Sequence, residues 1–246
     1  DRKSRPVLAQ DRGITLSETE NAILTTLYDE LNRPVMTGII YGRKLTDPWV
    51  PEFINADPTT VITVSTTYGG TIKIQGSPLT ASEINNTSVF KQLSFNYYDD
   101  YSYTGAKTFD AAHVNNLAYK NAGATGNVDA NTQTKRFAGM PTGNKTRVLN
   151  GNNSSPTFIS SSVFYDEEGR GLQAQGDNIK GGVEISSTQY HFDGRVLSTS
   201  QTHNGTGTPF TNFNILTKFK FDKIGRLVGI GKKLNSSNRN YITSPN

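Results

Sequence analysis

The sequence contains no cysteine among its 246 residues. Disulfide bonds and thiolate metal sites are therefore excluded, and the fold must be stabilised by packing and hydrogen bonding. No apolar run approaches the ~20 residues that a membrane-spanning helix needs, and helix-forming runs are scarce. Charged residues make up only 19% of the chain, whereas Asn, Thr, Ser and Gly are abundant. This composition predicts one large all-β domain with a real core, of a kind that fits a location outside the cytoplasm.

A short motif, aromatic-Asp-x-x-Gly-Arg, recurs along the chain. Its fullest copy is Tyr165–Arg170, and Phe221–Arg226 repeats it. Tyr28–Arg33 keeps the frame with Asn in the glycine position, and Phe192–Arg195 reads as a copy shortened by two residues. The motif predicts that the following residues form structural turns: Tyr28, Asp29, Arg33, Tyr165, Asp166, Gly169, Arg170, Phe192, Asp193, Gly194, Arg195, Phe221, Asp222, Gly225 and Arg226.

The copies are spaced almost evenly. Residues 1–8 resemble the second half of a copy, and Asp1 and Asp29 are 28 residues apart. Asp166 and Asp193 are 27 residues apart, and Asp193 and Asp222 are 29 apart. A period of this size indicates a repeat architecture, in which each unit packs only against its neighbours.

Each copy is predicted to be a strand, a tight turn and a returning strand. Asp favours the first position of a type I turn and Gly the fourth, and Asn32 is the best substitute for Gly where φ is positive. Aromatic and polar residues alternate before the turns, as in Lys218–Phe221, which is typical of a half-buried strand. Asp193-Gly194 is a strong signal for a two-residue hairpin. We expect each arginine to bond turn carbonyls or nearby Asp carboxylates, with a modest net contribution.

These residues resemble the YD-repeat, or Rhs-repeat, family in its Bacteroidetes-type form. Besides the motif, the similarity rests on Val163–Asn178, Tyr190–Leu197, Tyr97–Tyr103 and Gly139–Gly143, while the stretch 49–93 carries no repeat. The resemblance implies antiparallel β-hairpin repeats that form part of a spiralling YD/Rhs β-sheet shell. In many members of the family the shell encloses a C-terminal toxin, and related repeats occur in cell-surface adhesion proteins.

The resemblance therefore implies a structural role, with no enzyme activity in the repeats. The expected function is a wall segment of a secreted shell of the polymorphic-toxin kind, which encloses and delivers a C-terminal toxin or effector. The partners implied are the remainder of the same repeat chain, the enclosed toxin, and a translocon of type IX secretion with its carrier proteins. The implied location is secreted or on the bacterial cell surface, and no catalytic, cofactor or metal site is expected.

The whole of 1–246 is expected to be a single repeat region with three parts. Residues 1–75 hold repeats and a hairpin, in which Val61–Val64 and Thr71–Ile74 are joined through Tyr68-Gly69-Gly70. Residues 76–160 are expected to be an irregular Asn/Thr-rich insert with a short helix at Asp110–Leu117, and 161–246 returns to regular repeats. Since neither end looks like a polar capping unit, we expect a segment of a longer chain; a small domain with degenerate ends is the alternative.

Residues with catalytic or metal-binding chemistry are thinly spread. None of the three histidines, His113, His191 and His203, has the spacing of a zinc helix. His191 is expected to face away from the rings of Tyr190 and Phe192, which should share one face of a strand. The net charge of +4 comes without a dense basic face, which argues against nucleic-acid binding.

Two other functions fit parts of the sequence. A cell-surface adhesion or glycan-binding module would stack exposed aromatic rings on sugars, and packing inside the sheet is the competing explanation for such rings. An unrecognised hydrolase would need a catalytic constellation around His203 or Asp166. The candidate sugar-stacking residues are Tyr97, Tyr98, Tyr101, Tyr103 and Trp49.

Overall fold

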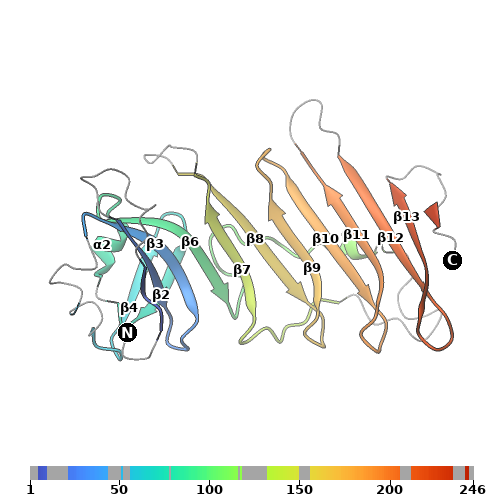
Figure 1. Cartoon of the computed structure of the whole chain (residues 1–246), viewed down its shortest axis with the longest axis horizontal. Helices are drawn as coiled ribbons and strands as arrows, with labels where there is room; N and C mark the ends of the chain where they lie inside the picture. Colours follow the sequence, from blue (N-terminus) through green and yellow to red (C-terminus); the bar gives the residue numbers. More distant parts are fainter. Residues whose placement is uncertain are drawn as a thin grey trace. The chain divides into compact units, whose positions relative to one another are not determined.

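Antiparallel strands dominate the computed structural model of the chain, and the expected all-β class is confirmed (Figure 1). The structure describes residues 5–9, 22–43, 51, 56–77, 79–115, 117, 132–149, 156–205, 212–234 and 242–243. The chain divides into two compact units. Unit 1 contains Asp1–Tyr97, Ser102–Gly105 and Asn144–Phe158; unit 2 contains Tyr98–Tyr101, Ala106–Gly143 and Ile159–Asn246.

Unit 1 is built around two adjacent hairpins. The first joins β2 (Ala22–Tyr28) to β3 (Pro34–Tyr41), and the second joins β4 (Val61–Thr66) to β5 (Gly70–Gln75), as the sequence predicted. Strand β6 (Phe90–Tyr98) pairs with β3, while β1 (Leu8–Ala9) and β5 both pair with β2. The helix α2 (Ala81–Asn85) begins with a capping box, in which Thr80 and Glu83 satisfy each other's backbone N–H groups.

The core of unit 1 is apolar and tightly packed. Its largest buried side chains include Ile23, Met36, Phe90 and Phe95, all of which are almost fully removed from solvent. The ring of Phe90 lies flat over the backbone of β3, where a Cβ on Gly38 would stand only 2.1 Å from the Cζ atom of Phe90. Glycine is therefore the residue that lets this ring approach the sheet.

Unit 2 is a meander in which each strand pairs with the next strand along the chain (Figure 1). This order means that every neighbouring pair is joined by a local connection, a topology that the alternating strands and turns predicted. Its strands are β8 (Phe158–Tyr165), β9 (Gly171–Asp177), β10 (Val183–Tyr190), β11 (Val196–His203), β12 (Phe213–Phe221), β13 (Leu227–Leu234) and β14 (Ile242–Thr243).

A β-bulge accompanies each repeat turn. The pairing register shifts by one residue immediately before Tyr28, Tyr165, Tyr190 and Phe221. Because a bulge places two residues of one strand opposite a single residue of its partner, the apolar residue two positions after the turn arginine is directed inward. Buried Leu172 and Leu197 occupy this position.

The stretch 76–160, expected to be an irregular insert, contains several regular elements. These are α2, β6, α3 (Ala111–Asn115), β7 (Pro141–Arg147) and the start of β8. The predicted helix at Asp110–Leu117 is confirmed as the five-residue α3. Residues 44–50, which include Trp49, lie outside the described part of the chain.

Candidate functional site

The repeat turns are organised by the aspartate carboxylate. In Tyr165–Arg170 the N–H of Asp166 donates to the carbonyl of Arg170 at 3.0 Å, and the N–H of Gly169 donates to the carbonyl of Asp166 at 3.1 Å. Oδ1 of Asp166 accepts from the backbone N–H groups of Glu168 (3.1 Å) and Arg170 (2.8 Å), and Oδ2 accepts from Nε of Arg170 at 2.7 Å. One carboxylate thus closes the turn and fixes the arginine.

The same geometry occurs at Asp29 and Asp222. Each accepts the Nε–H of the arginine four residues later at 2.7 Å, and each Oδ1 caps two backbone N–H groups. The expected bond between arginine and Asp carboxylate is therefore confirmed in these copies. Gly169 and Gly225 have φ values of 78° and 84°, and Asn32 has 64°, which explains the glycine position of the motif.

The supposed shortened copy at Phe192–Arg195 is a full-length one, and the sequence interpretation was wrong here. The N–H of His191 donates to the carbonyl of Arg195 at 2.8 Å, and the N–H of Gly194 donates to the carbonyl of His191 at 2.9 Å. His191 therefore occupies the position that Asp166 has in its own turn. Asp193, two residues later, supplies the carboxylate that accepts from Nε of Arg195 at 2.7 Å and contacts Nδ1 of His191 at 2.8 Å.

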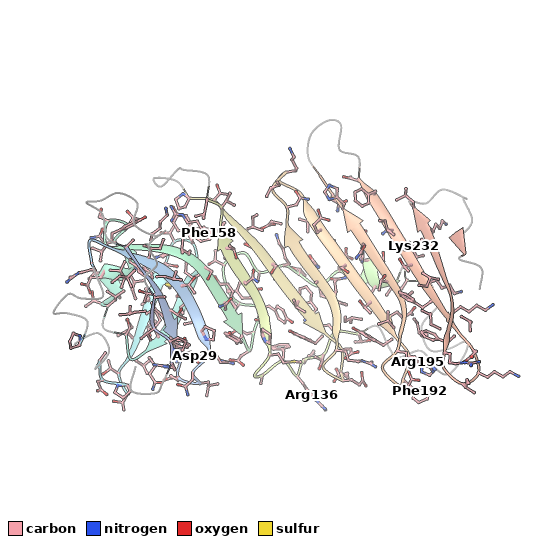
Figure 2. The ribbon with its side chains drawn as sticks, viewed as in Figure 1. Asp29, Arg136, Phe158, Phe192, Arg195 and Lys232 are labelled. Atoms are coloured by element: carbon pink, nitrogen blue, oxygen red, sulfur yellow. The ribbon has the colours of Figure 1, made fainter. Side chains whose placement is uncertain are left out.

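This alignment corrects two further expectations. The equivalent turn positions are 166, 191 and 222, so the repeats are 25 and 31 residues long and the even period of the aspartates was misleading. Phe192 does not share a strand face with Tyr190; it projects from the turn with 65% of its surface exposed, beside the His191 ring (Figure 2). The Arg195 guanidinium holds the pKa of Asp193 well below its usual range, chiefly through the hydrogen bond between them.

Two further turns of this type lack the motif. The first is the turn that joins β9 to β10, in which Asn178 takes the position that Asp166 has in its own turn. Oδ1 of Asn178 accepts from the N–H groups of Lys180 and Gly182, both at 3.0 Å. The other turn is split by a long insertion. The N–H of Asp99 donates to the carbonyl of Met140 at 3.1 Å, and the N–H of Gly139 donates to Oδ1 of Asp99 at 2.5 Å.

Neighbouring copies are joined by an arrangement that we call the ring clamp. The guanidinium of one copy lies over the aromatic ring of the next: Arg170 over Tyr190 at 4.6 Å, and Arg195 over Phe221 at 5.0 Å. The Tyr190 hydroxyl also donates to the carbonyl of Gly171, the residue after that arginine, at 2.9 Å. The ring is thus held by a cation–π contact on one side and a hydrogen bond at its tip.

Unit 1 has the same ring clamp at its start. Arg5 lies 4.6 Å from the centre of the Tyr28 ring, and the Tyr28 hydroxyl donates to the carbonyl of Pro6 at 2.6 Å. In both units, if the observed residue pairing is continued along the two neighbouring strands, each clamp arginine lies directly opposite the ring that it contacts. The sequence expectation that residues 1–8 resemble part of a copy is consistent with this contact.

In unit 2, residues 106–115 and 117 cross one face of the sheet, and we call them the crossing segment. The Lys107 N–H donates to Oγ of Ser162 on β8 at 3.0 Å, and its ammonium group pairs with Asp177 at the end of β9. The short green helix α3 lies behind β10 and β11 in Figure 1. Its Val114 packs with Leu117 and Leu172 in an apolar cluster.

Two glutamines of β9 bind the backbone of the crossing segment. The Gln173 amide accepts from the N–H of Asp110 at 2.8 Å and donates to the carbonyl of the same residue at 3.0 Å. The Gln175 amide donates to the carbonyl of Thr108 at 2.7 Å and to Oε1 of Gln173 at 2.7 Å. Both glutamines are buried, so this amide network holds an extended chain by its main-chain groups.

His113 anchors the segment to two more strands. Its Nδ1 contacts Oγ of Ser187 on β10 at 2.7 Å, and its Nε2 contacts Oγ1 of Thr202 on β11 at 2.8 Å. Burial lowers the pKa of the imidazole, and the nearby Asp110 opposes this effect only in part. No local pattern distinguishes His113 from the other histidines, because its partners are 74 and 89 residues away.

Most of the rings considered for sugar stacking are engaged with other rings. Tyr97 is buried, stacks on Tyr103 with ring centres 3.9 Å apart, and donates to the carbonyl of Gly69 at 2.9 Å. Burial raises the pKa of its hydroxyl well above the usual range. Tyr101 stacks on Phe164 at 4.9 Å. These contacts support the packing explanation for the three rings.

Among the residues that the structure describes, no three or more histidine, aspartate or glutamate side chains lie together in a way that could hold a metal ion. His203 pairs with Glu184 and stacks on Phe213, and Glu184 also accepts from the Asn178 amide at 3.0 Å. Within the same residues, no helix has the length and apolarity to cross a membrane.

No known protein-family model matches the chain, and no curated protein matches it. The turns, the ring clamps and the crossing segment are therefore the observations on which a functional proposal rests.

Proposed function

We propose that this chain is a structural wall segment of a secreted YD/Rhs-repeat shell, which encloses and delivers a C-terminal toxin or effector. The observation that carries the proposal is the ring clamp, because in unit 2 it joins Arg170 to the ring of the next turn and Arg195 to the ring of the turn after that. Contacts of this kind let a sheet extend strand by strand with nearest-neighbour interactions alone. A wall is the role that such a sheet fills best.

The buried polar face of unit 2 supports the same role. Ser162, Gln173, Gln175 and Ser187 are buried on the face that the crossing segment covers, and they hold that segment through main-chain groups and hydroxyls. Amide side chains that bind a polypeptide by its backbone select little for sequence. A lining of this type suits a container whose contents differ from one protein to another.

The remaining parts of the proposal concern partners and location. The shell would be completed by the remainder of the same repeat chain, would hold a toxin segment, and would leave a bacterial cell through a secretion translocon with its carrier proteins. The wall itself needs no cofactor and performs no catalysis in this proposal. The resemblance of the turn motifs to YD/Rhs repeats is the source of these expectations.

The mass of the native polypeptide tests the proposal. Antibodies raised against this segment would be used on cell-envelope and culture-medium fractions of the source organism. A band several times heavier than 26.9 kDa is the expected result, together with protection of an associated polypeptide from added protease. A native band near that mass in both fractions would refute the shell and would favour a small surface-binding module, which a glycan array would then test.

A further inference from the structure

His113 joins the crossing segment to the sheet of unit 2 through both of its ring nitrogens. Nδ1 contacts Oγ of Ser187 at 2.7 Å, and Nε2 contacts Oγ1 of Thr202 at 2.8 Å. Each hydroxyl also accepts from a side-chain amide of a further strand: Ser187 from Gln173 at 3.0 Å, and Thr202 from Asn214 at 2.7 Å. One imidazole thus completes a polar network that runs across β9, β10, β11 and β12.

This network fits the neutral form of the imidazole. A neutral imidazole carries one N–H and one bare nitrogen, so one of the two hydroxyls must donate to the ring. Protonation makes both nitrogens donors, and the hydroxyl that donated must then turn its hydrogen away while it still accepts from an amide. A cation is also costly at this place, because His113 is only 8% exposed and Ser187 is fully buried.

The charge nearest to the ring along its own segment is that of Asp110. Its Oδ1 accepts the backbone N–H of His113 at 3.0 Å. Burial lowers the pKa of His113, and the Asp110 carboxylate raises it by a smaller amount. The balance therefore favours the neutral ring in the docked segment.

The charged and titratable side chains of β9–β12 lie away from the ring. They are Asp177, Glu184, His203, Lys218 and Lys220. The aspartate pairs with Lys107. The glutamate and the histidine pair with each other one position beyond Thr202, so they leave the sheet on its other face. Both lysines lie at least four strand positions from Asn214, which is roughly 13 Å along β12.

The crossing segment is held largely by polar bonds. Amide side chains of β9 bind its backbone at Thr108 and Asp110. Each such bond has a small net free energy, because water offers the released groups an equivalent partner. Its apolar anchors are Phe109, Val114 and Leu117. A segment attached in this way can open locally at a lower free energy than the whole sheet.

We propose that protonation of His113 releases the crossing segment from β9–β11, so that the segment acts as a strap that opens in acid. In the released segment the imidazole is in water and has a pKa of about 6.5. The pKa in the docked segment is lower, so the docked state binds the proton more weakly. The ratio of released to docked molecules therefore rises as the pH falls below about 6.5, by at most about tenfold for each pH unit.

Release would uncover a polar surface of the sheet. Gln173 and Ser187 are 1% and 0% exposed while the segment is docked. The inference goes beyond the proposed function, because it concerns contacts inside unit 2 alone. It holds whether or not the chain forms part of a shell.

Two spin labels on the full 246-residue protein would measure the position of the segment. Ala112→Cys places one label on the exposed side of α3, and Ala174→Cys places the other on the exposed outer face of β9. Both sites are labelled selectively, because the chain has no native cysteine. Pulsed electron–electron double resonance should give one narrow distance distribution at pH 7.5. At pH 5.0 a longer and broader distribution should appear, with the released-to-docked ratio raised about 5- to 30-fold and the far-UV circular dichroism unchanged.

His113→Gln is the matched variant, because an amide can donate to one hydroxyl and accept from the other without titrating. Its ratio should change by less than about twofold between the two pH values. His203→Gln, on the other face of the sheet, should keep the full response. An equal response in His113→Gln and the wild type, identical distances at both pH values, or a longer distance only where the circular dichroism signal is lost would overturn the inference.

Hydrogen exchange in the unlabelled wild type gives a second readout, which decides the matter if His113→Gln is released at every pH. The amide of Asp110, which donates to Gln173, should lose protection relative to the amide of Asp166, which closes a repeat turn. The loss should begin near pH 6.5, the ordinary range of an imidazole. Constant protection, or a loss that begins only below about pH 4.5, where carboxylates titrate, would refute the role of His113.

Discussion

Replacing Asp166 by asparagine isolates the contribution of the carboxylate charge to a repeat turn. The Oδ1 atom of asparagine can still accept the N–H groups of Glu168 and Arg170, as Asn178 does natively in its own turn. What is lost is the charge-assisted bond from Nε of Arg170, which is 2.7 Å long. Asp222→Asn removes a bond of the same length to Arg226, so the two variants differ mainly in their surroundings.

Burial should make the two losses unequal. The Asp166 side chain is only 3% exposed, and that of its partner Arg170 is 19% exposed, so water replaces little of the lost bond. A hydrogen bond to a charged group in such a site contributes about 1.5–3 kcal/mol. Glu168, which also contacts Arg170 at 3.1 Å, should keep the loss near the lower end. For Asp222 the arginine partner is largely in water, and the change in stability should lie within experimental error.

Urea unfolding followed by far-UV circular dichroism would measure both variants. With a slope of about 1–3 kcal/mol per M, Asp166→Asn should lower the midpoint by roughly 0.5–2 M, while Asp222→Asn should leave it in place. Hydrogen exchange at the Glu168 and Arg170 amides provides a local check on the same turn. Equal shifts in the two variants, or a larger one for Asp222→Asn, would show that burial does not control the strength of these turns.

Three further predictions can be tested with the same protein. Gly38→Ala should destabilise unit 1 by about 1–3 kcal/mol, because the new methyl overlaps the Phe90 ring; adding Phe90→Leu should recover part of the loss in urea midpoints, and a neutral Gly38→Ala would contradict the packing. Gly169→Val and Gly225→Val should each be destabilising, because a β-branched residue resists their positive φ; unchanged midpoints in both would refute the turn geometry. The pKa of His113 is lowered from 6.5 by burial, so protonation disfavours the folded state: stability should be full above about pH 6.5 and decline as the pH falls through the folded pKa. Unfolding midpoints between pH 7.5 and 4.5 should show this decline in the wild type and a weaker one in His113→Gln, and parallel profiles would exclude His113 as its source.

Short-range signals in the sequence correctly predicted the strands on either side of the repeat turns and several of the turns themselves, but not β6 and β7 in the stretch expected to be irregular. Asp166, Gly169 and Arg170 act within five consecutive residues, so their chemistry can be recognised without the fold. The sequence interpretation aligned Asp193 with Asp166, because Asp193 is the aspartate nearest to Gly194 and Arg195. The backbone hydrogen bonds of the turn instead join Gly194 and Arg195 to His191, which is therefore the residue equivalent to Asp166. Asn178 was missed because its turn has neither the aromatic-Asp pair nor the arginine of the motif, although Gly181 keeps the glycine spacing.

Long-range features were beyond the reach of local patterns. The Asp99 turn closes against Gly139 and Met140, about forty residues away, and no motif spans that interval. Gln173 acts on backbone groups of Asp110, 63 residues earlier, and a polar residue in a strand normally indicates a solvent-facing position. Only the assembled sheet shows that this glutamine faces a second layer of polypeptide.

The divided turn at Asp99 stays closed although the chain leaves it and returns only at Gly139, forty residues later. Its two closing hydrogen bonds hold the ends of the intervening chain as close together as an uninterrupted turn would. The entropy of closing a flexible loop rises slowly with its length, by only about 0.6 kcal/mol for each doubling. The turn can therefore stay closed over a long insertion, and in this protein the inserted chain supplies the crossing segment that covers one face of the unit 2 sheet.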